Sequence, residues 1–156
     1  CSPDIIIADE PTTALDVTVQ AKILRLLYDL QQAMHASLLL ITHDLGVVAA
    51  MADEVIVMYA GRIVERADVD TLFHAPRHPY TKALLACIDG ISDRKAPLEP
   101  IQGTAPDLKE PQQGCRFAPR CPAVREECRR HDPALRPASA GHDVACLLVH
   151  PEAVHG

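Results

Sequence analysis

Tryptophan is absent from this 156-residue chain, and aromatic residues make up only 3% of it. Recognition of bases by stacking therefore has few platforms. Basic residues are also in deficit: 15 stand against 21 acidic ones, for a formal net charge of −6. An acidic chain is a poor electrostatic partner for a phosphate backbone. We therefore expect no nucleic acid among its partners.

Long apolar runs are missing as well. The longest, such as residues 37–41, have the length of a buried strand and fall far short of the roughly 20 residues that span a bilayer. Nothing at the N-terminus resembles a signal peptide, so we expect no direct membrane span. The first residue is Cys1 instead of Met and leads straight into a strand-like run, which indicates a truncated frame or an excised piece.

Composition divides the chain near residue 90. Before this point, apolar runs alternate with helical periodicity, which predicts an α/β unit. The predicted strands cover 5–8, 38–42, 55–59 and 62–65. One predicted helix begins after Asp16, which caps it, and three more cover 45–51, 68–73 and 80–88. After it come most of the 13 prolines and no long periodic segment. We divide the chain into 1–66, a helical segment at 67–90, a Pro-rich linker at 91–114 and a four-Cys segment at 115–156.

The strand predicted at 5–8 ends in two consecutive carboxylates, Asp9 and Glu10. Ligands of α/β proteins bind at the carboxyl edge of the sheet. A pair of acids there suits magnesium and phosphate chemistry, because one can hold the metal while the next polarises an attacking water. Strand-end acids also serve as helix caps, so the pair alone favours neither interpretation.

The longer sequence around these acids is more specific. Residues 9–16, DEPTTALD, resemble the Walker B motif and D-loop of ATP-binding-cassette (ABC) ATPases, and residues 41–44, ITHD, resemble their switch histidine. The resemblance implies ATP and magnesium as cofactors, with Asp9 as a metal ligand and Glu10 as the general base for water. It also implies that Asp16 reaches across a dimer interface and that His43 contacts the γ-phosphate. Taken singly, His43 is an ordinary loop histidine and Asp44 a helix N-cap.

The phosphate-binding half of such an ATPase is absent from the sequence. No G-x-x-x-x-G-K-[ST] loop occurs in the chain, and neither does a Leu-Ser-Gly-Gly signature. The resemblance therefore implies the distal part of a P-loop ABC-type ATPase domain, an incomplete parallel sheet with helices, followed by a small irregular Cys-rich extension. We expect that this chain alone neither hydrolyses ATP nor folds fully, because strands of its sheet would lack their neighbours.

Residues 74–85 narrow the family. The sequence HAPRHPYTKALL resembles the His-Pro-Tyr segment of dipeptide and oligopeptide importer ATPases, a family that also includes nickel importers. The residues themselves have a structural explanation, since Pro79 suits the first turn of a helix. The resemblance implies transmembrane permease subunits and a second ATPase subunit as partners. It also implies a peripheral location at the cytoplasmic face of the inner membrane.

Four of the six cysteines follow the pattern C-x5-C-x6-C-x17-C: Cys115, Cys121, Cys128 and Cys146. Four thiolates can close a zinc site or hold a four-iron cluster, and these gaps are wider than the pairs typical of zinc. The resemblance implies the same, since the extension of the peptide-importer ATPases is expected to carry an iron–sulfur cluster. We predict a 4Fe–4S cluster, with zinc, free thiols and disulfides as alternatives. A non-catalytic metal-binding module is the alternative for the chain as a whole.

Overall fold

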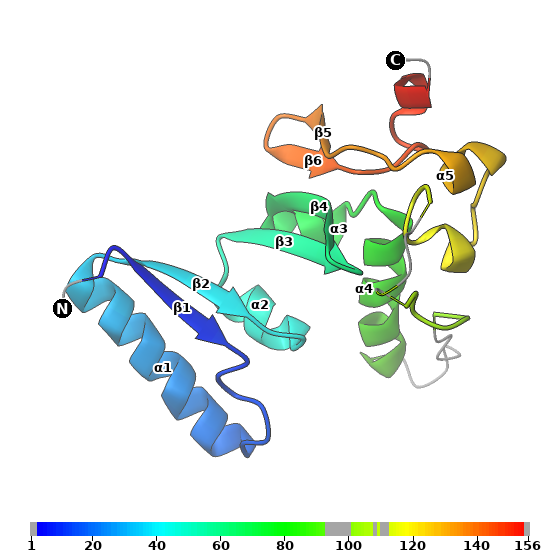
Figure 1. Ribbon diagram of the computed structural model, residues 1–156. Coiled ribbons are helices and arrows are strands. Elements are labelled where there is room, and N and C mark those ends of the chain that lie inside the picture. The colour runs from blue at the N-terminus through cyan, green and yellow to red at the C-terminus, as the bar shows by residue number, and fades with distance from the viewer. Residues whose placement is uncertain (1–2, 93–100, 108, 110–112, 155–156) are drawn as a thin grey trace. The chain divides into compact units, whose positions relative to one another are not determined.

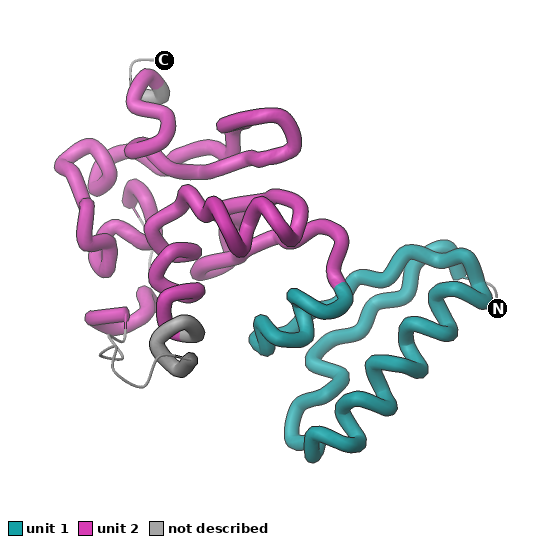
Figure 2. The backbone as a smooth tube through the Cα atoms, turned by 180° about the vertical axis from the view of Figure 1, so that it is seen from behind, with its two compact units in different colours: residues 1–51 teal, residues 52–156 magenta. Residues whose placement is uncertain are grey.

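The computed structural model describes residues 3–92, 101–107, 109 and 113–154. The chain forms two compact units, residues 1–51 and residues 52–156 (Figure 2). Its mixed α/β character is confirmed, with one parallel and one antiparallel sheet. The elements, labelled in Figure 1, are β1 (Ile5–Asp9), α1 (Val17–Met34), β2 (Ser37–Ile41), α2 (Leu45–Met51), β3 (Glu54–Tyr59), β4 (Arg62–Asp68), α3 (Val69–His74), α4 (Pro79–Ser92), η1 (Ala118–Arg120), α5 (Glu126–Arg130), β5 (Arg136–Ser139), β6 (His142–Val144) and η2 (Pro151–Val154).

The first unit is a strand–helix–strand–helix arrangement. β1 and β2 pair in parallel, from Ile5 opposite Ser37 to Asp9 opposite Ile41, and the 18-residue helix α1 makes the crossover that a parallel pair needs. The cap predicted for this helix is confirmed. The Asp16 carboxylate accepts hydrogen bonds from the amides of Thr18 and Val19, at 2.9 and 3.0 Å.

One face of this two-stranded sheet is open to solvent. Neighbours in a parallel register share a face, and the four exposed apolar residues of the pair lie on the same one: Ile5, Ile7, Leu39 and Ile41. The alternate residues, such as Ala8 and Leu40, are more buried. The unbroken apolar runs of these strands predict burial on both faces. This prediction is wrong, because only one side of the sheet is covered.

The second unit is built on a four-stranded antiparallel sheet in the order β3-β4-β6-β5. The strands predicted at 55–59 and 62–65 leave a two-residue turn between them, and this turn is present between β3 and β4. Both of its central residues, Ala60 and Gly61, have positive φ, at 49° and 77°. A two-residue turn of this kind matches the twist of the strands it joins. α3 follows β4 directly, and the Asp68 carboxylate caps it by accepting from the amide of Thr71 at 2.8 Å.

An aromatic cluster lies in the core of this unit. The rings of Tyr59 and Tyr80 are 4.7 Å apart between centroids, and Phe117 lies 5.2 Å from Tyr59 and 5.4 Å from Tyr80. These three belong to β3, α4 and the segment before η1, so three of the chain's five Tyr and Phe residues join widely separated parts of the sequence. Aromatic pairs in such tilted arrangements add about 0.5–1.5 kcal/mol each beyond area burial.

The four-Cys segment contains more regular structure than its sequence predicts. β5 and β6 form a hairpin whose strand β6 adds to the edge of β4, with Val144 opposite Glu65. A small apolar cluster of Ala118, Cys128 and Leu147 lies beside it. Attachment to β4 thus supplies the packing that the segment lacks by itself. Half of the linker predicted at 91–114 lies outside the described residues.

Candidate functional site

Glu10 and His43, two of the predicted nucleotide-site residues, meet at one edge of the parallel pair. β1 ends at Asp9 and β2 at Ile41, which are opposite each other. The register continues one residue further, because the amide of Glu10 donates to the carbonyl of Ile41 at 2.8 Å. Glu10 and His43 therefore leave the sheet at the same edge. This is the placement expected for a ligand site in an α/β fold.

Glu10 and His43 are in direct contact. His43 Nδ1 lies 2.8 Å from Glu10 Oε1, and the Thr13 hydroxyl donates to Glu10 Oε2 at 2.5 Å. The hydroxyl of Thr13, followed by His43, lowers the pKa of the Glu10 carboxyl. In turn the Glu10 carboxylate raises the pKa of the His43 imidazole. Both shifts favour the charged forms, but an exposed pair of this kind contributes little to stability.

The backbone around Glu10 is in a rare conformation. Glu10 and Ala14 have φ angles of +48° and +63°, in the left-handed region that residues other than glycine seldom occupy. Turn hydrogen bonds hold this segment, from the amide of Thr13 to the Glu10 carbonyl and from Leu15 to Thr12, both at 3.2 Å. Strain of this kind is concentrated at functional sites. Here it brings the Thr13 hydroxyl back onto the carboxylate, a contact that the sequence interpretation missed.

The other two predicted nucleotide-site residues are placed differently. Asp9 is exposed at the end of β1. Asp16 lies at the start of α1, where its Oδ1 atom is engaged as the helix cap. The structure thus brings Glu10 and His43 together, with Asp9 adjacent in sequence, and assigns Asp16 a structural contact.

The His-Pro-Tyr segment has a structural role in the second unit. The buried carboxylate of Glu65 accepts from the amides of Arg77 and His78, at 2.7 and 3.0 Å, and lies 2.7 Å from His142 Nε2. His78 Nδ1 accepts from the amide of Tyr80 at 3.0 Å, at the start of α4. Burial lowers the pKa of His78 to about 4, so the ring is neutral at pH 7.

The four cysteines do not form a metal centre. Cys115, Cys121, Cys128 and Cys146 line one cavity of about 10 Å³, room for one water molecule at most. Among the described residues, no group of three or more His, Cys, Asp or Glu side chains could hold a metal ion. The predicted iron–sulfur cluster is therefore wrong, and the zinc alternative and the metal-binding module are equally without support. Burial raises the pKa of the Cys115 thiol to about 11 and also raises that of Cys121 and Cys146. These thiols are thus neutral, small apolar groups, with Cys146 buried and Cys115 and Cys121 partly buried.

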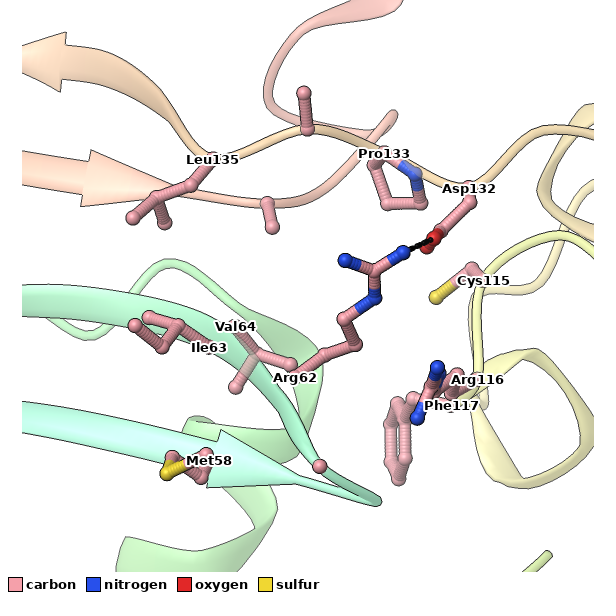
Figure 3. Close-up of a pocket in the computed structure, with 13 residues that line it drawn as sticks. Met58, Arg62, Ile63, Val64, Cys115, Arg116, Phe117, Asp132, Pro133 and Leu135 are labelled. Atoms are coloured by element: carbon pink, nitrogen blue, oxygen red, sulfur yellow. Dashed lines mark hydrogen bonds and ion pairs between the residues drawn. The ribbon is translucent and has the colours of Figure 1, made fainter. Parts of the chain in front are cut away.

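A larger cavity of about 510 Å³ lies between the β3–β4 turn and the segments at 115–117 and 132–135 (Figure 3). Its charged groups are already engaged. The Arg62 guanidinium reaches across it to Asp132 at 2.7 Å, and Arg116 donates to the carbonyl of Ala60. A ligand site needs polar groups that converge on the ligand. None of the residues predicted for nucleotide chemistry lines this cavity.

Comparison with known proteins defines the class. The chain is 54% identical over 147 residues to a probable peptide ABC transporter ATP-binding protein of Sinorhizobium fredii, covering 94% of the chain and 44% of that protein. It is 51% identical over 152 residues to the oligopeptide transport ATP-binding protein AppD of Bacillus subtilis, covering 97% and 46%. For the dipeptide transport ATP-binding protein DppD of Escherichia coli the identity is 48% over 146 residues, covering 94% and 45%. The chain spans less than half the length of each.

Residues 64–128 match the family described as "Oligopeptide/dipeptide transporter, C-terminal region". This match confirms the resemblance based on the His-Pro-Tyr segment. Among the described residues, no helix has both the length and the apolar character to cross a membrane.

Proposed function

We propose that this chain supplies the magnesium-binding and water-activating residues of an ATP-hydrolysis site in a peptide importer. The observation that supports this most directly is the 2.8 Å contact between Glu10 and His43, beside Asp9 at the edge of the parallel strands. The names of the relatives, all of them ATP-binding proteins of peptide transporters, support the same function.

The residues at this edge suit magnesium. Magnesium in nucleotide sites needs only one or two protein carboxylates, because water and the phosphates of the nucleotide complete its shell. Asp9, exposed at the end of β1, is the residue that would hold it. When bound, the ion neutralises charge on the phosphates.

Glu10 is the proposed base. Its lowered pKa keeps the carboxyl ionised at neutral pH, so that an oxygen of Glu10 can accept a proton from the attacking water. His43 presents Nδ1 to Glu10, which leaves Nε2 for the γ-phosphate. Its raised pKa favours a positive charge there, which attracts an anion. Asp16 is the residue we assign to the interface with a second ATPase subunit.

We propose that the phosphate-binding loop of this site comes from polypeptide outside this chain. The chain has no G-x-x-x-x-G-K-[ST] loop, and the open apolar face of β1 and β2 offers a surface for neighbouring structure. The chain alone is then inactive. Its partners would be transmembrane permease subunits and a second ATPase subunit at the cytoplasmic face of the membrane, with peptides as the transported solutes.

A chimera tests this function. The chain replaces the matching segment of AppD from Bacillus subtilis, and ATP hydrolysis by the purified chimera is compared with that of its Glu10→Gln variant. We expect a loss of about 10²-fold or more, the usual contribution of a general base. Glu54→Gln, at an exposed position of β3, is the matched control and keeps the full rate.

An unchanged rate in the Glu10→Gln chimera would contradict the role of Glu10. The isolated chain is assayed in parallel and should not hydrolyse ATP. If the isolated chain hydrolyses ATP and this activity disappears in Glu10→Gln, the proposal that the phosphate-binding loop lies outside the chain is contradicted.

A further inference from the structure

A hydrogen bond joins the start of α1 to the loop that carries the switch histidine. Gln20 Nε2 donates to Asp44 Oδ2 at 3.0 Å, across 24 residues of sequence. Gln20 lies in the first turn of α1, where its amide donates to the carbonyl of Asp16 at 2.8 Å. Asp44 directly follows His43. Both side chains are partly buried, so water competes for this bond less than for an exposed one.

The two oxygens of the Asp44 carboxylate have separate partners. Oδ1 accepts from the amides of Gly46 and Val47 at 2.9 and 3.3 Å and so caps α2. Oδ2 accepts from Gln20. The amide of Asp44 in turn donates to the Thr42 hydroxyl at 3.0 Å. Capping needs only one oxygen, so the bond to Gln20 is additional to it and ties the loop to a second helix.

We propose that Gln20 is a positioning residue for His43. By fixing Asp44 it sets the path of the loop at 42–44 and so holds His43 against Glu10. The same bond links this loop to the segment at 12–16, which turns from Glu10 into α1. A shift of that segment, such as contact with a second subunit would cause, is then passed to His43 through Gln20 and Asp44.

This inference rests on the proposed function for the importance of His43, but its geometry can be tested without ATP. The test follows the ring protons of His43 by NMR in the full 156-residue chain as pH is varied. Because Glu10 raises the pKa of His43, a Glu10→Gln variant defines the midpoint of a His43 that has lost this partner. Each other variant is placed between that value and the wild-type value.

Three variants separate positioning from capping. Gln20→Ala removes the hydrogen-bond donor, and the alanine that replaces it is a strong helix former. Gln20→Glu places a second carboxylate against Asp44. The double variant Gln20→Glu/Asp44→Asn exchanges donor and acceptor, which restores the bond and keeps a good N-cap at position 44. Gln32→Ala, at an exposed glutamine near the other end of α1, is the control.

We expect the His43 midpoint to fall toward the Glu10→Gln value in Gln20→Ala and further in Gln20→Glu. In the double variant it should rise above the Gln20→Glu value but stay below the wild-type value, because the Asp44 charge that also raises the pKa of His43 is lost. In Gln32→Ala it should stay at the wild-type value. Wild-type midpoints in both single variants would overturn the proposal, and so would a double variant no better than Gln20→Glu. If Gln20→Ala loses the dispersed amide signals of residues 3–51, the comparison of Gln20→Glu with the double variant decides. The chimera's ATPase rate does not enter this test, so either proposal can fail alone.

Discussion

The Oε1 atom of Glu65 lies 2.7 Å from Nε2 of His142, a residue 77 positions later in the chain. Both side chains are almost fully buried, at 0% and 2% exposed. The same carboxylate accepts from the amides of Arg77 and His78. Glu65 on β4 therefore holds together the loop before α4 and the C-terminal hairpin, two segments that are far apart in the sequence.

Replacing Glu65 with Gln should destabilise the second unit. The Glu65 carboxylate only accepts hydrogen bonds. The amide of a glutamine would have to point its own NH₂ donor at one of the groups that now donate to Glu65, which are the two backbone amides and the His142 ring. A buried group left unsatisfied costs about 1–3 kcal/mol. We expect a loss of that size in the free energy of unfolding, measured by urea titration at pH 7. Glu54→Gln, exposed on β3, should change it by less than about 0.5 kcal/mol, and equal losses in the two variants would contradict this account of Glu65.

His78 should make stability depend on pH. Its pKa is about 4 in the folded chain, below the ordinary value of 6.5, because burial disfavours the imidazolium. Between these values the unfolded chain binds a proton that the folded chain does not. The free energy of unfolding therefore falls as pH drops from 6.5 to 4, by a total of order 3 kcal/mol, and this contribution is constant above that window.

A His78→Asn variant isolates that contribution. Asn can accept from the amide of Tyr80 as a helix cap but does not titrate in this range. Urea titrations at several pH values should give a smaller loss on acidification in His78→Asn than in the wild type. His131→Asn, at an exposed position, should follow the wild type. Identical pH profiles for all three chains would show that His78 is not the titrating group.

Gly114 and Gly141 offer a matched pair. Both have a φ of +69°, but a Cβ at Gly114 would lie 2.5 Å from the backbone carbonyl atoms of Arg129, whereas nothing lies within 4 Å of one at Gly141. Gly141→Ala should therefore cost about 1 kcal/mol, from backbone strain alone. Gly114→Ala should cost about 1–3 kcal/mol more because of the clash. Thermal unfolding of both variants measures the difference, and similar melting temperatures would show that the segment at 114 can move.

Thr13 should control the ionisation of Glu10. Its hydroxyl is the largest cause of the lowered pKa of that carboxyl. In Thr13→Ala the midpoint of Glu10, followed by carbon-13 NMR of the carboxyl, should rise toward the ordinary value. Thr13→Ser keeps the hydroxyl and should titrate like the wild type. A Glu10 midpoint that is the same in Thr13→Ala and Thr13→Ser would remove Thr13 from the site.

The sequence predicted those parts of the structure that local rules determine. The order of strands and helices up to α4 follows from apolar periodicity, the Asp16 cap from a residue type suited to that position, and the turn at Ala60 and Gly61 from a break between two strand-like runs. The meeting of Glu10 and His43 follows from parallel pairing, since Glu10 comes directly after β1 and His43 two residues after β2.

Other contacts depend on tertiary packing that no local pattern shows. The hairpin of β5 and β6 has few apolar residues to indicate strands, and it forms by adding to β4. The spacing of the cysteines suggested ligands, but burial raises the pKa of Cys115, Cys121 and Cys146 and keeps these thiols neutral. The contact of Thr13 with Glu10 depends on left-handed backbone at Glu10, although the three-residue spacing is a signal that could have suggested it.

The aromatic cluster determines what optical spectroscopy can report. Without tryptophan, near-ultraviolet circular dichroism arises mainly from three tyrosines. Tyr59 and Tyr80 pack together in the second unit, while Tyr28 on α1 is exposed. Their dichroic signal will therefore follow melting of the second unit and remain almost silent about residues 3–51. Optical spectroscopy of the segment that carries Glu10 and His43 therefore requires a separate probe attached to that segment.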